Sequence, residues 1–237
     1  MEDSLKSAWL QACKSDGPAT INVADSVFNE GPVIIDGTDC RNPDVITFDM
    51  EGTTHLAPDY TKFGEAEQWI KLYHVNNVSI KGGTLDAGGG SLYECKAGGG
   101  DCPDGATTFA IHNSVGVTIT GLTLKNSQMF HMAIVDSSKV LVEGITIEAP
   151  GDSPNTDGIH ISGSNKVTIT GTNTIATGDD CISIGQGCDT VTVEGVNCGP
   201  GHGISIGSLG KYAGEKPVQH ITVHNVEFHE TKNGARI

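Results

Sequence analysis

The sequence predicts an all-β protein built as a parallel β-helix, in which each coil of the chain stacks on the preceding one. One observation behind this prediction is a strand motif that occurs four times: a polar residue, a small residue and an Ile-x-Ile triplet, with Ala in the first Ile position of the last copy. The copies begin at Asp157, Asp180, His202 and Asn233, so they start 23, 22 and 31 residues apart. A repeat of this length is typical of stacked coils. In a parallel stack, equivalent residues would lie about 4.8 Å apart.

The second observation is a hydrophobic-x-hydrophobic-x-Gly pattern that recurs through the same part of the chain. Its copies lie at residues 78–82, 117–121, 140–144, 167–171, 191–195 and, with a final Asn, 221–225. The alternation predicts a strand and the Gly a tight turn after it. A third short strand follows at 122–124 and 145–147, which gives three strands per coil. A β-propeller or a leucine-rich solenoid fits less well, because four-stranded blades with aromatic motifs and the leucine-rich spacing are absent.

The sequence of the N-terminal part predicts a helix that is followed by short strands. Residues 3–14 place Leu5, Ala8, Trp9 and Ala12 on one face before Gly17-Pro18 ends the helix, which would cap the open end of the stack. Short β-like runs follow at residues 20–23, 32–35 and 45–48, whereas residues 61–74 look less regular.

We therefore expect a single β-helix domain over residues 1–237, with a helical cap in 1–17, regular coils in 77–237 and an incomplete C-terminus. The Gly-rich stretch 86–107 breaks the period and is predicted to be a loop, which Cys95 and Cys102 could close.

Composition agrees with a turn-rich β protein. The chain has 237 residues, enough for one sizeable core, with 32 glycines and 5% aromatic residues. It has no run of 18 apolar residues that would predict a membrane span. The net charge of −15 argues against nucleic acid as a partner, because phosphate binding needs a basic stripe.

The seven cysteines are too numerous and too widely spread for a zinc site of paired C-x2-C ligands. They favour an oxidising compartment, and their odd number predicts a free thiol or a missing partner. The sequon Asn77-Val78-Ser79 weakly supports secretion. The chain opens on a polar segment rather than on a signal peptide, so the start is expected to be missing. Neither a metal nor a cofactor is expected.

The repeat brings three carboxyl groups, Asp157, Asp179 and Asp180, toward one wall. Stacked like charges raise the pKa of at least one of them. A raised carboxyl group beside an ionised one is the arrangement for acid–base hydrolysis of a glycosidic bond. Strict alternation would turn Asp157 into the core, so we expect the backbone to bend at Asp157 and Asp180, eased by Gly158, Gly178 and Gly203.

The remaining polar positions of the motif lie on the same wall. His202 would bind an anionic substrate or tune the protonation of a neighbour. Arg236 takes the outward position also held by His160, Ser183 and Ser205, where it would clamp a substrate carboxylate. The Ser and His positions are either substrate contacts or solvated groups. A serine nucleophile is excluded, because no nucleophile-elbow sequence is present.

At these residues the sequence resembles the polygalacturonases of glycoside hydrolase family 28, in particular plant exopolygalacturonases of the pollen type. The resemblance rests on four motifs: NTDGIH (155–160), GDDCISIG (178–185), CGPGHGISIGSLG (198–210) and the start of an R-I-K motif at Arg236. It implies a right-handed, single-stranded parallel β-helix that hydrolyses α-1,4 bonds between galacturonates in pectin with inversion.

The resemblance also implies roles for individual residues. Asp179 would be the general acid, Asp157 and Asp180 would hold and activate the water, and His202 and Arg236 would bind substrate. Asn155, His160, Ser183 and Ser205 join Arg236 as expected substrate contacts, and Cys181 pairs with Cys198. The expected stacking of about 5 Å suggests retention under the general spacing rule, whereas the family implies inversion.

Compared with the family, the chain lacks a signal peptide and a first strand, and it stops before the Lys of R-I-K. We therefore expect a secreted, cell-wall protein truncated at both ends that acts as a monomer on pectin or oligogalacturonate. Two other functions stay open. One is a catalytically dead remnant that at most binds oligogalacturonate, and the other is a Ca²⁺-dependent lyase, which needs carboxylate ligands and a basic Arg.

Overall fold

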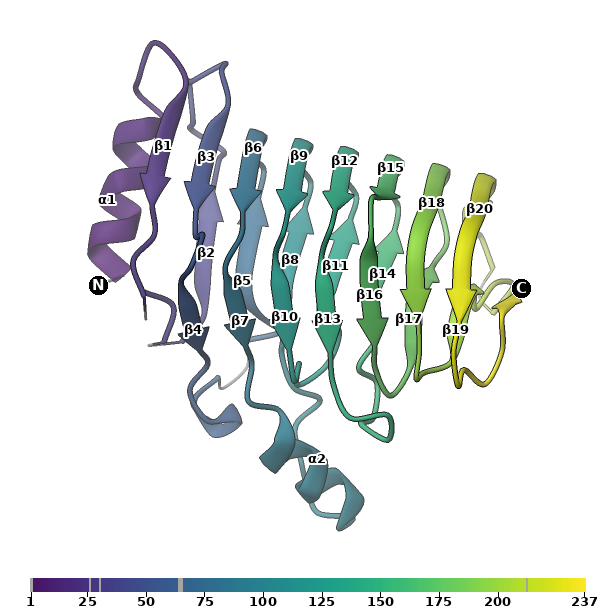
Figure 1. The fold of residues 1–237 in the computed structure, drawn as a ribbon. Coiled ribbons are helices and arrows are strands. Elements are labelled where there is room, and N and C mark those ends of the chain that lie inside the picture. Colours follow the sequence, from purple (N-terminus) through teal and green to yellow (C-terminus); the bar gives the residue numbers. More distant parts are fainter. Residues whose placement is uncertain (1, 26, 30, 64–65, 212) are drawn as a thin grey trace.

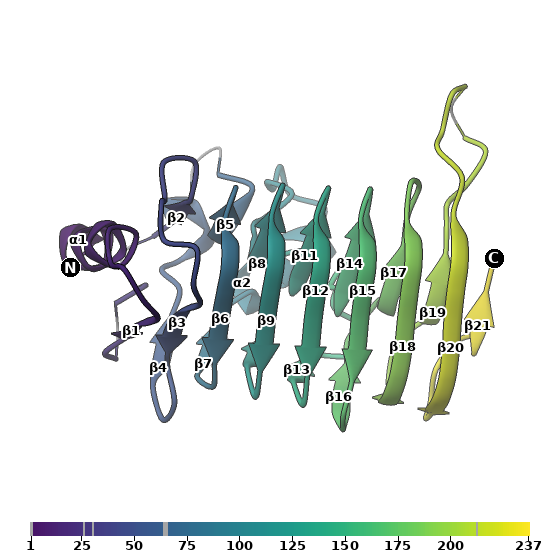
Figure 2. The same cartoon turned by 90° about the horizontal axis from the view of Figure 1, so that it is seen from above.

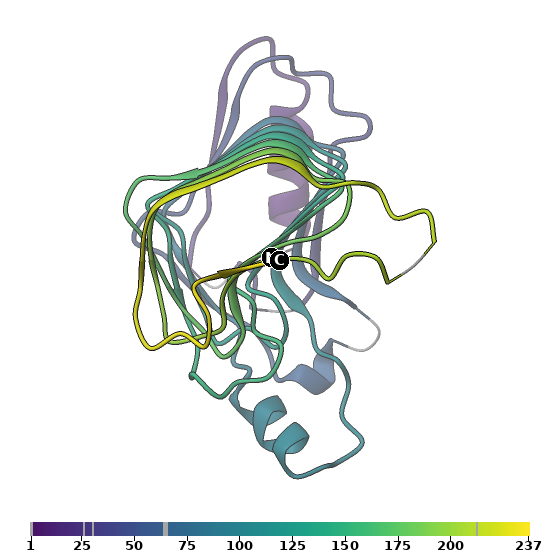
Figure 3. The same ribbon diagram turned by 90° about the vertical axis from the view of Figure 1, so that its right-hand side faces the viewer.

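The computed structural model describes residues 2–25, 27–29, 31–63, 66–211 and 213–237. As predicted, the chain forms a right-handed parallel β-helix (Figure 1). Figure 3 looks along the stack from the C-terminal end, where the chain runs counterclockwise as it approaches the viewer. Among the described residues, no helix is long and apolar enough to cross a membrane.

The described strands form two sheets, sheet A of thirteen strands and sheet B of eight. Sheet B consists, in spatial order, of β2 (Val33–Asp36), β5 (Gln68–Tyr73), β8 (Thr107–His112), β11 (Met132–Val135), β14 (Ile159–Ser162), β17 (Asp180–Ile184), β19 (Gly203–Ile206) and β21 (Ala235–Arg236). Neighbouring strands of sheet B are parallel and come from successive coils.

Sheet A bends and so supplies the other two sides of each coil (Figure 3). Its first row consists of β1 (Ala19–Asn22), β3 (Ile46–Asp49), β6 (Asn76–Lys81), β9 (Val115–Thr120), β12 (Ser138–Glu143), β15 (Asn165–Thr170), β18 (Asp189–Cys198) and β20 (Gln219–Phe228). Its second row consists of β4 (Thr54–Leu56), β7 (Thr84–Asp86), β10 (Thr123–Lys125), β13 (Thr146–Glu148) and β16 (Asn173–Ala176). The rows join at the long strand β18, which pairs with both β15 and β16.

The core is a set of apolar ladders, because equivalent inward residues of successive coils stack on one another. Ile111, Ile134, Ile161 and Ile184 are paired rung to rung in sheet B, and all four are fully buried. Each such side chain contributes about 1.5–3 kcal/mol by leaving water. The regular spacing of these residues in the sequence is therefore the direct cause of the stack.

A buried serine ladder runs beside the apolar ladders. The hydroxyl oxygen of Ser137 accepts a hydrogen bond from the amide of Ser114 at 3.1 Å, and that of Ser164 accepts one from the amide of Ser137 at 3.0 Å. The next coil has Cys188 at this position, since Asn165 pairs with Asp189. Cys188 is buried and is the one free thiol among the described cysteines. It is the unpaired cysteine that the odd count predicts.

The predicted N-terminal helix is confirmed as α1 (Glu2–Ala12), which lies across the first coil (Figures 1 and 2). Trp9 is buried, its indole nitrogen donates to the carbonyl of Asp36 at 2.8 Å, and its ring stacks on Phe48. A disulfide between Cys13 and Cys40 ties the end of the helix to the loop after β2. The three predicted short strands correspond to β1, β2 and β3.

Two predictions about the irregular stretches are wrong. Residues 61–74 contain β5, whose apolar side chains do not follow a strict period of two. The stretch 86–107 contains a helix, α2 (Gly90–Ala97), which its flanking glycines conceal. The Cys95–Cys102 disulfide closes this insert, as predicted. A 3₁₀ turn, η1 (Tyr60–Lys62), lies in the preceding coil, and both η1 and α2 belong to loops that lead from sheet A into sheet B.

Candidate active site

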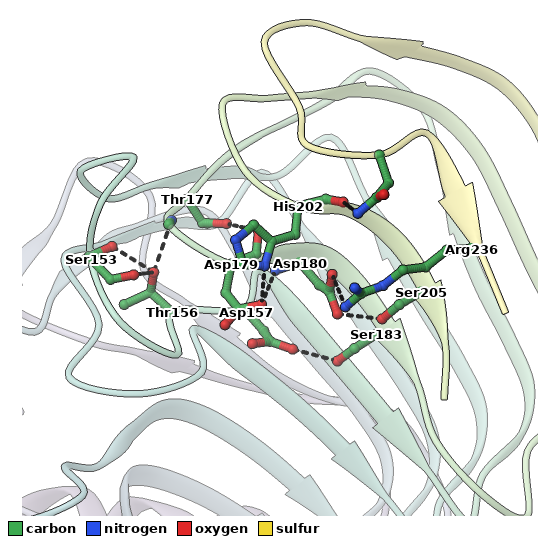
Figure 4. A network of polar contacts seen from close by, with 12 residues as sticks. Ser153, Thr156, Asp157, Thr177, Asp179, Asp180, Ser183, His202, Ser205 and Arg236 are labelled. Carbon is green, nitrogen blue, oxygen red and sulfur yellow. Dashed lines mark hydrogen bonds and ion pairs between the residues drawn. The ribbon is translucent and has the colours of Figure 1, made fainter. Parts of the chain in front are cut away.

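The three carboxyl groups meet where the chain enters strands of sheet B (Figure 4). Ile159 pairs with Ile182, which puts Asp157 at the level of Asp180, as the motif alignment predicts. Arg236 pairs with Ser205, so the predicted outward column of His160, Ser183, Ser205 and Arg236 is present in the register of β14, β17, β19 and β21.

The alignment is wrong for His202, which lies opposite Asp179 rather than Asp180. The register shifts between Asp180 and Ile182, so that Asp180 pairs with Gly203. A bulge of this kind inserts one residue into one strand and re-aims its neighbours. The backbone amide of His202 consequently donates to the carbonyl of Asp179 at 2.7 Å.

Close backbone approach explains two glycines in the predicted bend. A Cβ atom at Gly158 would lie 2.4 Å from the carbonyl oxygen of Cys181, and one at Gly178 would lie 2.0 Å from that of Ser153. No side chain fits at these distances. The coils of the site therefore approach one another more closely than a chain with alanine at these positions would allow.

Asp157 is a buried carboxyl group of the cluster with a raised pKa. Its side chain is buried, and Oδ2 accepts a hydrogen bond of 2.6 Å from the Ser183 hydroxyl. Burial raises the pKa of Asp157 to about 7; the Ser183 hydrogen bond opposes this rise, and the charges of Asp179 and Asp180 add to it. Asp157 is therefore the carboxyl group with the raised pKa that the sequence predicts, and it holds a proton at mildly acidic pH.

Asp180 is buried between a hydroxyl and a guanidinium group. Its Oδ2 accepts a short hydrogen bond from the Ser205 hydroxyl, and Oδ1 lies 3.5 Å from Nη2 of Arg236. Oδ1 has no hydrogen-bond donor among the described residues. The side chain of Arg236 is 50% exposed and that of Asp180 only 8%. Arg236 therefore faces both the carboxylate and the solvent-filled side of the site.

Asp179 is the more exposed carboxyl group and the one in contact with the predicted histidine. Its Oδ1 accepts the backbone amide of Asp180 at 2.8 Å and lies 3.0 Å from Nδ1 of His202. The side chain remains 24% exposed, against 8% for Asp180. Its carboxyl group is therefore held on one oxygen and partly accessible to solvent.

The other predicted contact residues divide into two groups. The hydroxyls of Ser183 and Ser205 point at carboxylates of the preceding coil (Figure 4). Nδ1 of His160 lies 2.8 Å from the Ser183 hydroxyl. Asn155 instead occupies an exposed turn at φ 54°, a conformation that Asn tolerates. Asp180, Ser205 and Arg236 line a hollow of about 550 Å³ with residues 206–209 and Ile237.

Sequence reasoning missed residues that support the site from behind. The Thr156 hydroxyl oxygen contacts Ser153 at 2.6 Å and accepts the Gly178 amide at 3.0 Å, which joins the loop before Asp157 to the turn before Asp179. His131 is fully buried, and its Nδ1 lies 3.1 Å from the carbonyl of Asp157. Burial lowers the pKa of His131 to about 4, so its ring is neutral and Nδ1–H donates. One signal for His131 was available: it directly precedes Met132, the residue that pairs with Ile159 at the start of β14.

Asp179, Asp180 and His202 each offer a potential metal ligand within 4.8 Å of the others. Proximity alone does not identify a metal site, because acidic clusters occur without an ion. The disulfide that the family resemblance implies is present between Cys181 and Cys198, and it links the first residues of β17 to the end of β18.

Known proteins resemble this chain over nearly its whole length. The model of the glycosyl hydrolases family 28 matches residues 13–237. A polygalacturonase of Prunus persica is 48% identical over 99% of this chain, and an exopolygalacturonase of Platanus acerifolia is 39% identical over 100% of it. This chain spans only 60% and 63% of the lengths of these relatives.

Solved structures share the fold at low sequence identity. An endo-xylogalacturonan hydrolase from Aspergillus tubingensis is 21% identical, with a TM-score of 0.76 over 99% of this chain and 63% of that one. A polygalacturonase from Erwinia carotovora ssp. carotovora is 20% identical, with a TM-score of 0.71 over 92% of this chain and 70% of that one. With the family match extending over nearly the whole sequence, the chain belongs to the glycosyl hydrolases family 28.

Proposed function

We propose that this chain is a polygalacturonase, which hydrolyses α-1,4 bonds between galacturonates in pectin. The observation that carries the proposal is the cluster of Asp157, Asp179 and Asp180 on adjacent coils, in which Asp179 is partly exposed and contacts His202 while Asp157 and Asp180 are buried beside it. Acid–base cleavage of a glycosidic bond needs a proton donor and a base on opposite sides of the anomeric carbon. The family match and the polygalacturonase relatives support the same substrate class.

In the proposed reaction, Asp179 donates its proton to the glycosidic oxygen as the C1–O bond breaks. Its exposure and its contact with His202 suit a group that meets the leaving sugar. Asp157 helps to orient a water, and Asp180 takes one proton from it as the water oxygen bonds to C1. Proton transfer by a positioned carboxyl group supplies about 10²–10⁴-fold of rate. Inversion at C1 is part of the proposal.

The substrate is bound at Arg236, which occupies the last position of the outward column of sheet B. Arg236 binds a galacturonate carboxylate and supplies local positive charge in a chain whose net charge is −15. His202 and Asn155 contact the sugars beside the point of cleavage. We further infer that the protein is secreted into the cell wall, a compartment in which its three disulfides would form and persist.

The test is release of reducing ends from polygalacturonate by the purified chain, compared with Asp179→Asn and with Asp152→Asn, an exposed aspartate of the neighbouring loop. We expect release by the wild type and by Asp152→Asn, and a loss of about 10²–10⁴-fold in Asp179→Asn. Proton NMR of the first product would give the anomer. Formation of an unsaturated product that is abolished by a chelator would indicate a lyase instead.

A second candidate is binding of oligogalacturonate without turnover. It is favoured by the contacts of Asp180 with Arg236 and Ser205, because a carboxylate engaged by a guanidinium group and a hydroxyl is less free to take a proton from water. Calorimetric binding of oligogalacturonate by a folded chain that releases no reducing ends would support this function over hydrolysis.

A further inference from the structure

A continuous hydrogen-bond chain runs from His160 through Ser183 to Asp157. The Ser183 hydroxyl oxygen lies 2.6 Å from Oδ2 of Asp157 and 2.8 Å from Nδ1 of His160. His160 and Ser183 are register partners on β14 and β17, and Asp157 lies two residues before the first residue of β14. Residues of two neighbouring coils thus meet at one carboxylate oxygen.

The direction of this chain follows from the proton count. The Ser183 hydroxyl has a single proton, and it is donated to Asp157. The same oxygen can then only accept from His160, so Nδ1 of His160 carries a proton. Burial lowers the pKa of His160, which favours the neutral ring and leaves the lone pair on Nε2. The ring is therefore a fixed donor toward Ser183.

Packing holds the histidine ring in place. The ring of Phe130 stacks on His160 with 4.8 Å between centroids and 24° between planes. Ser183 is only 4% exposed, so its hydroxyl has little access to water that would otherwise compete for its proton. Neither observation fits a side chain whose main partner is a bound sugar.

Other groups face Asp157 as well, and their effects differ. The carboxylates of Asp179 and Asp180 oppose its ionisation. His131 contacts the backbone carbonyl of Asp157 rather than its carboxyl group, and His202 contacts Asp179. Among the described residues, Ser183 is the one whose side chain donates a hydrogen bond to the Asp157 carboxylate.

We propose that His160 is a positioning residue for Asp157. It acts through Ser183, whose hydroxyl it keeps directed at the Asp157 carboxylate. The role rests on the proposed function, in which Asp157 must be ionised to help activate the water. Without the Nδ1–H donor, the Ser183 hydroxyl can rotate away, and the ionised form of Asp157 loses the charge-assisted hydrogen bond from this side chain. Ionisation of Asp157 then requires a higher pH.

The direct experiment is a carbon-detected NMR titration of ¹³C-labelled aspartate carboxyl groups, with Asp157 assigned from Asp157→Asn. His160→Leu and Ser183→Ala are each expected to raise the pKa of Asp157 by about 1, and the double variant no further, because both break one chain. His160→Asn places an amide N–H near the Nδ1 position and should restore the wild-type value. Ser162→Ala, at the other outward position of β14, is the matched control.

Kinetics provide the second measurement. If the chain hydrolyses polygalacturonate, the acidic limb of kcat/KM should move up by about 1 pH unit in His160→Leu, with KM for a short oligogalacturonate little changed. If it has no turnover, the proposed function fails, and the NMR titration still decides the role of His160. An unchanged Asp157 titration in folded His160→Leu and Ser183→Ala would overturn the proposal, as would a raised KM with an unmoved pH profile.

Discussion

At the scale of single residues, each buried carboxylate of the site receives its hydroxyl from the following coil. Ser183 donates to Asp157, and Ser205 donates to Asp180. The Ile-x-Ile alignment predicted where these serines lie but left open whether they touch substrate. Their direction could not be read from the sequence, because it depends on how closely successive coils approach.

Asp157 is held in an environment that favours its neutral form, so its ionisation should weaken the fold. Its pKa of about 7 in the folded chain exceeds the ordinary value of 3.8. The folded state therefore binds more protons than the unfolded state between these values, and stability falls as the pH rises from about 4 to 7. Asp157→Asn should remove this loss, which is on the order of 1–4 kcal/mol.

Thermal unfolding at several pH values checks this prediction. The melting temperature of Asp157→Asn should exceed that of the wild type at pH 8 and approach it at pH 4. A difference that is constant with pH would contradict a raised pKa at Asp157. Asp152→Asn, in the same loop but exposed, should show no such pH-dependent gain.

Ser205 tests the second hydroxyl–carboxylate pair. Ser205→Ala leaves the buried Asp180 without its hydroxyl donor, so we expect kcat to fall about tenfold, in keeping with the loss of one hydrogen bond to a charged group. Ser205→Thr keeps the hydroxyl and should retain most activity. Steady-state kinetics on polygalacturonate would show this, and equal rates in Ser205→Ala and wild type would exclude the role.

At the scale of elements, the loop before β14 and the turn before β17 are fitted to one another. The Gly178 amide donates to Thr156, and the Gly178 Cα lies against the Ser153 backbone. Gly178→Ala should therefore destabilise the fold by about 1–3 kcal/mol and displace Asp179. Gly151→Ala is the control, because its nearest contact would be an ordinary 3.4 Å. Chemical denaturation of both variants measures the difference, and equal stabilities would refute the tight contact.

The elements also show what the sequence can and cannot predict. The stack, the order of its coils and the column from His160 to Arg236 were predictable, because inward apolar residues recur at a fixed period. The partner of His202 was not, since the bulge at Cys181 leaves no mark in the motif. Helix α2 and strand β5 were missed where the period breaks, and His131 was missed because its partner is a backbone carbonyl.

At the scale of the whole molecule, the outer face of sheet B carries a column of paired residues that runs from Ile34 through Lys71 to Arg236, with a cation near one end and another at the other end. Lys71 pairs with Ala110, which pairs with Ala133 and then with His160, while Arg236 lies beyond the serines. Lys71 lies over the ring of Tyr73, 5.3 Å from its centroid, and three strand spacings of about 4.8 Å separate it from His160.

This arrangement predicts a length-dependent contribution from Lys71. Lys71→Ala should raise KM for long oligogalacturonates several-fold and leave KM for a disaccharide unchanged, because only long chains reach it. Lys81→Ala, on the outer side of sheet A, is the matched control. A KM that rises equally for every substrate length would show that Lys71 does not form a distant binding position.

The direction of the two serine contacts has a consequence for biosynthesis. Each carboxylate is completed by a coil that leaves the ribosome later: Asp157 by the coil of Ser183, Asp180 by the coil of Ser205 and then by Arg236. Until the later coil docks, the earlier carboxylate sits at the growing edge of the solenoid, hydrated and free to ionise. Coils of a solenoid stabilise their nearest neighbours, so the nascent chain can add them one at a time without burying an unsatisfied charge. The strained acidic centre is thus assembled only after the scaffold beneath it has folded.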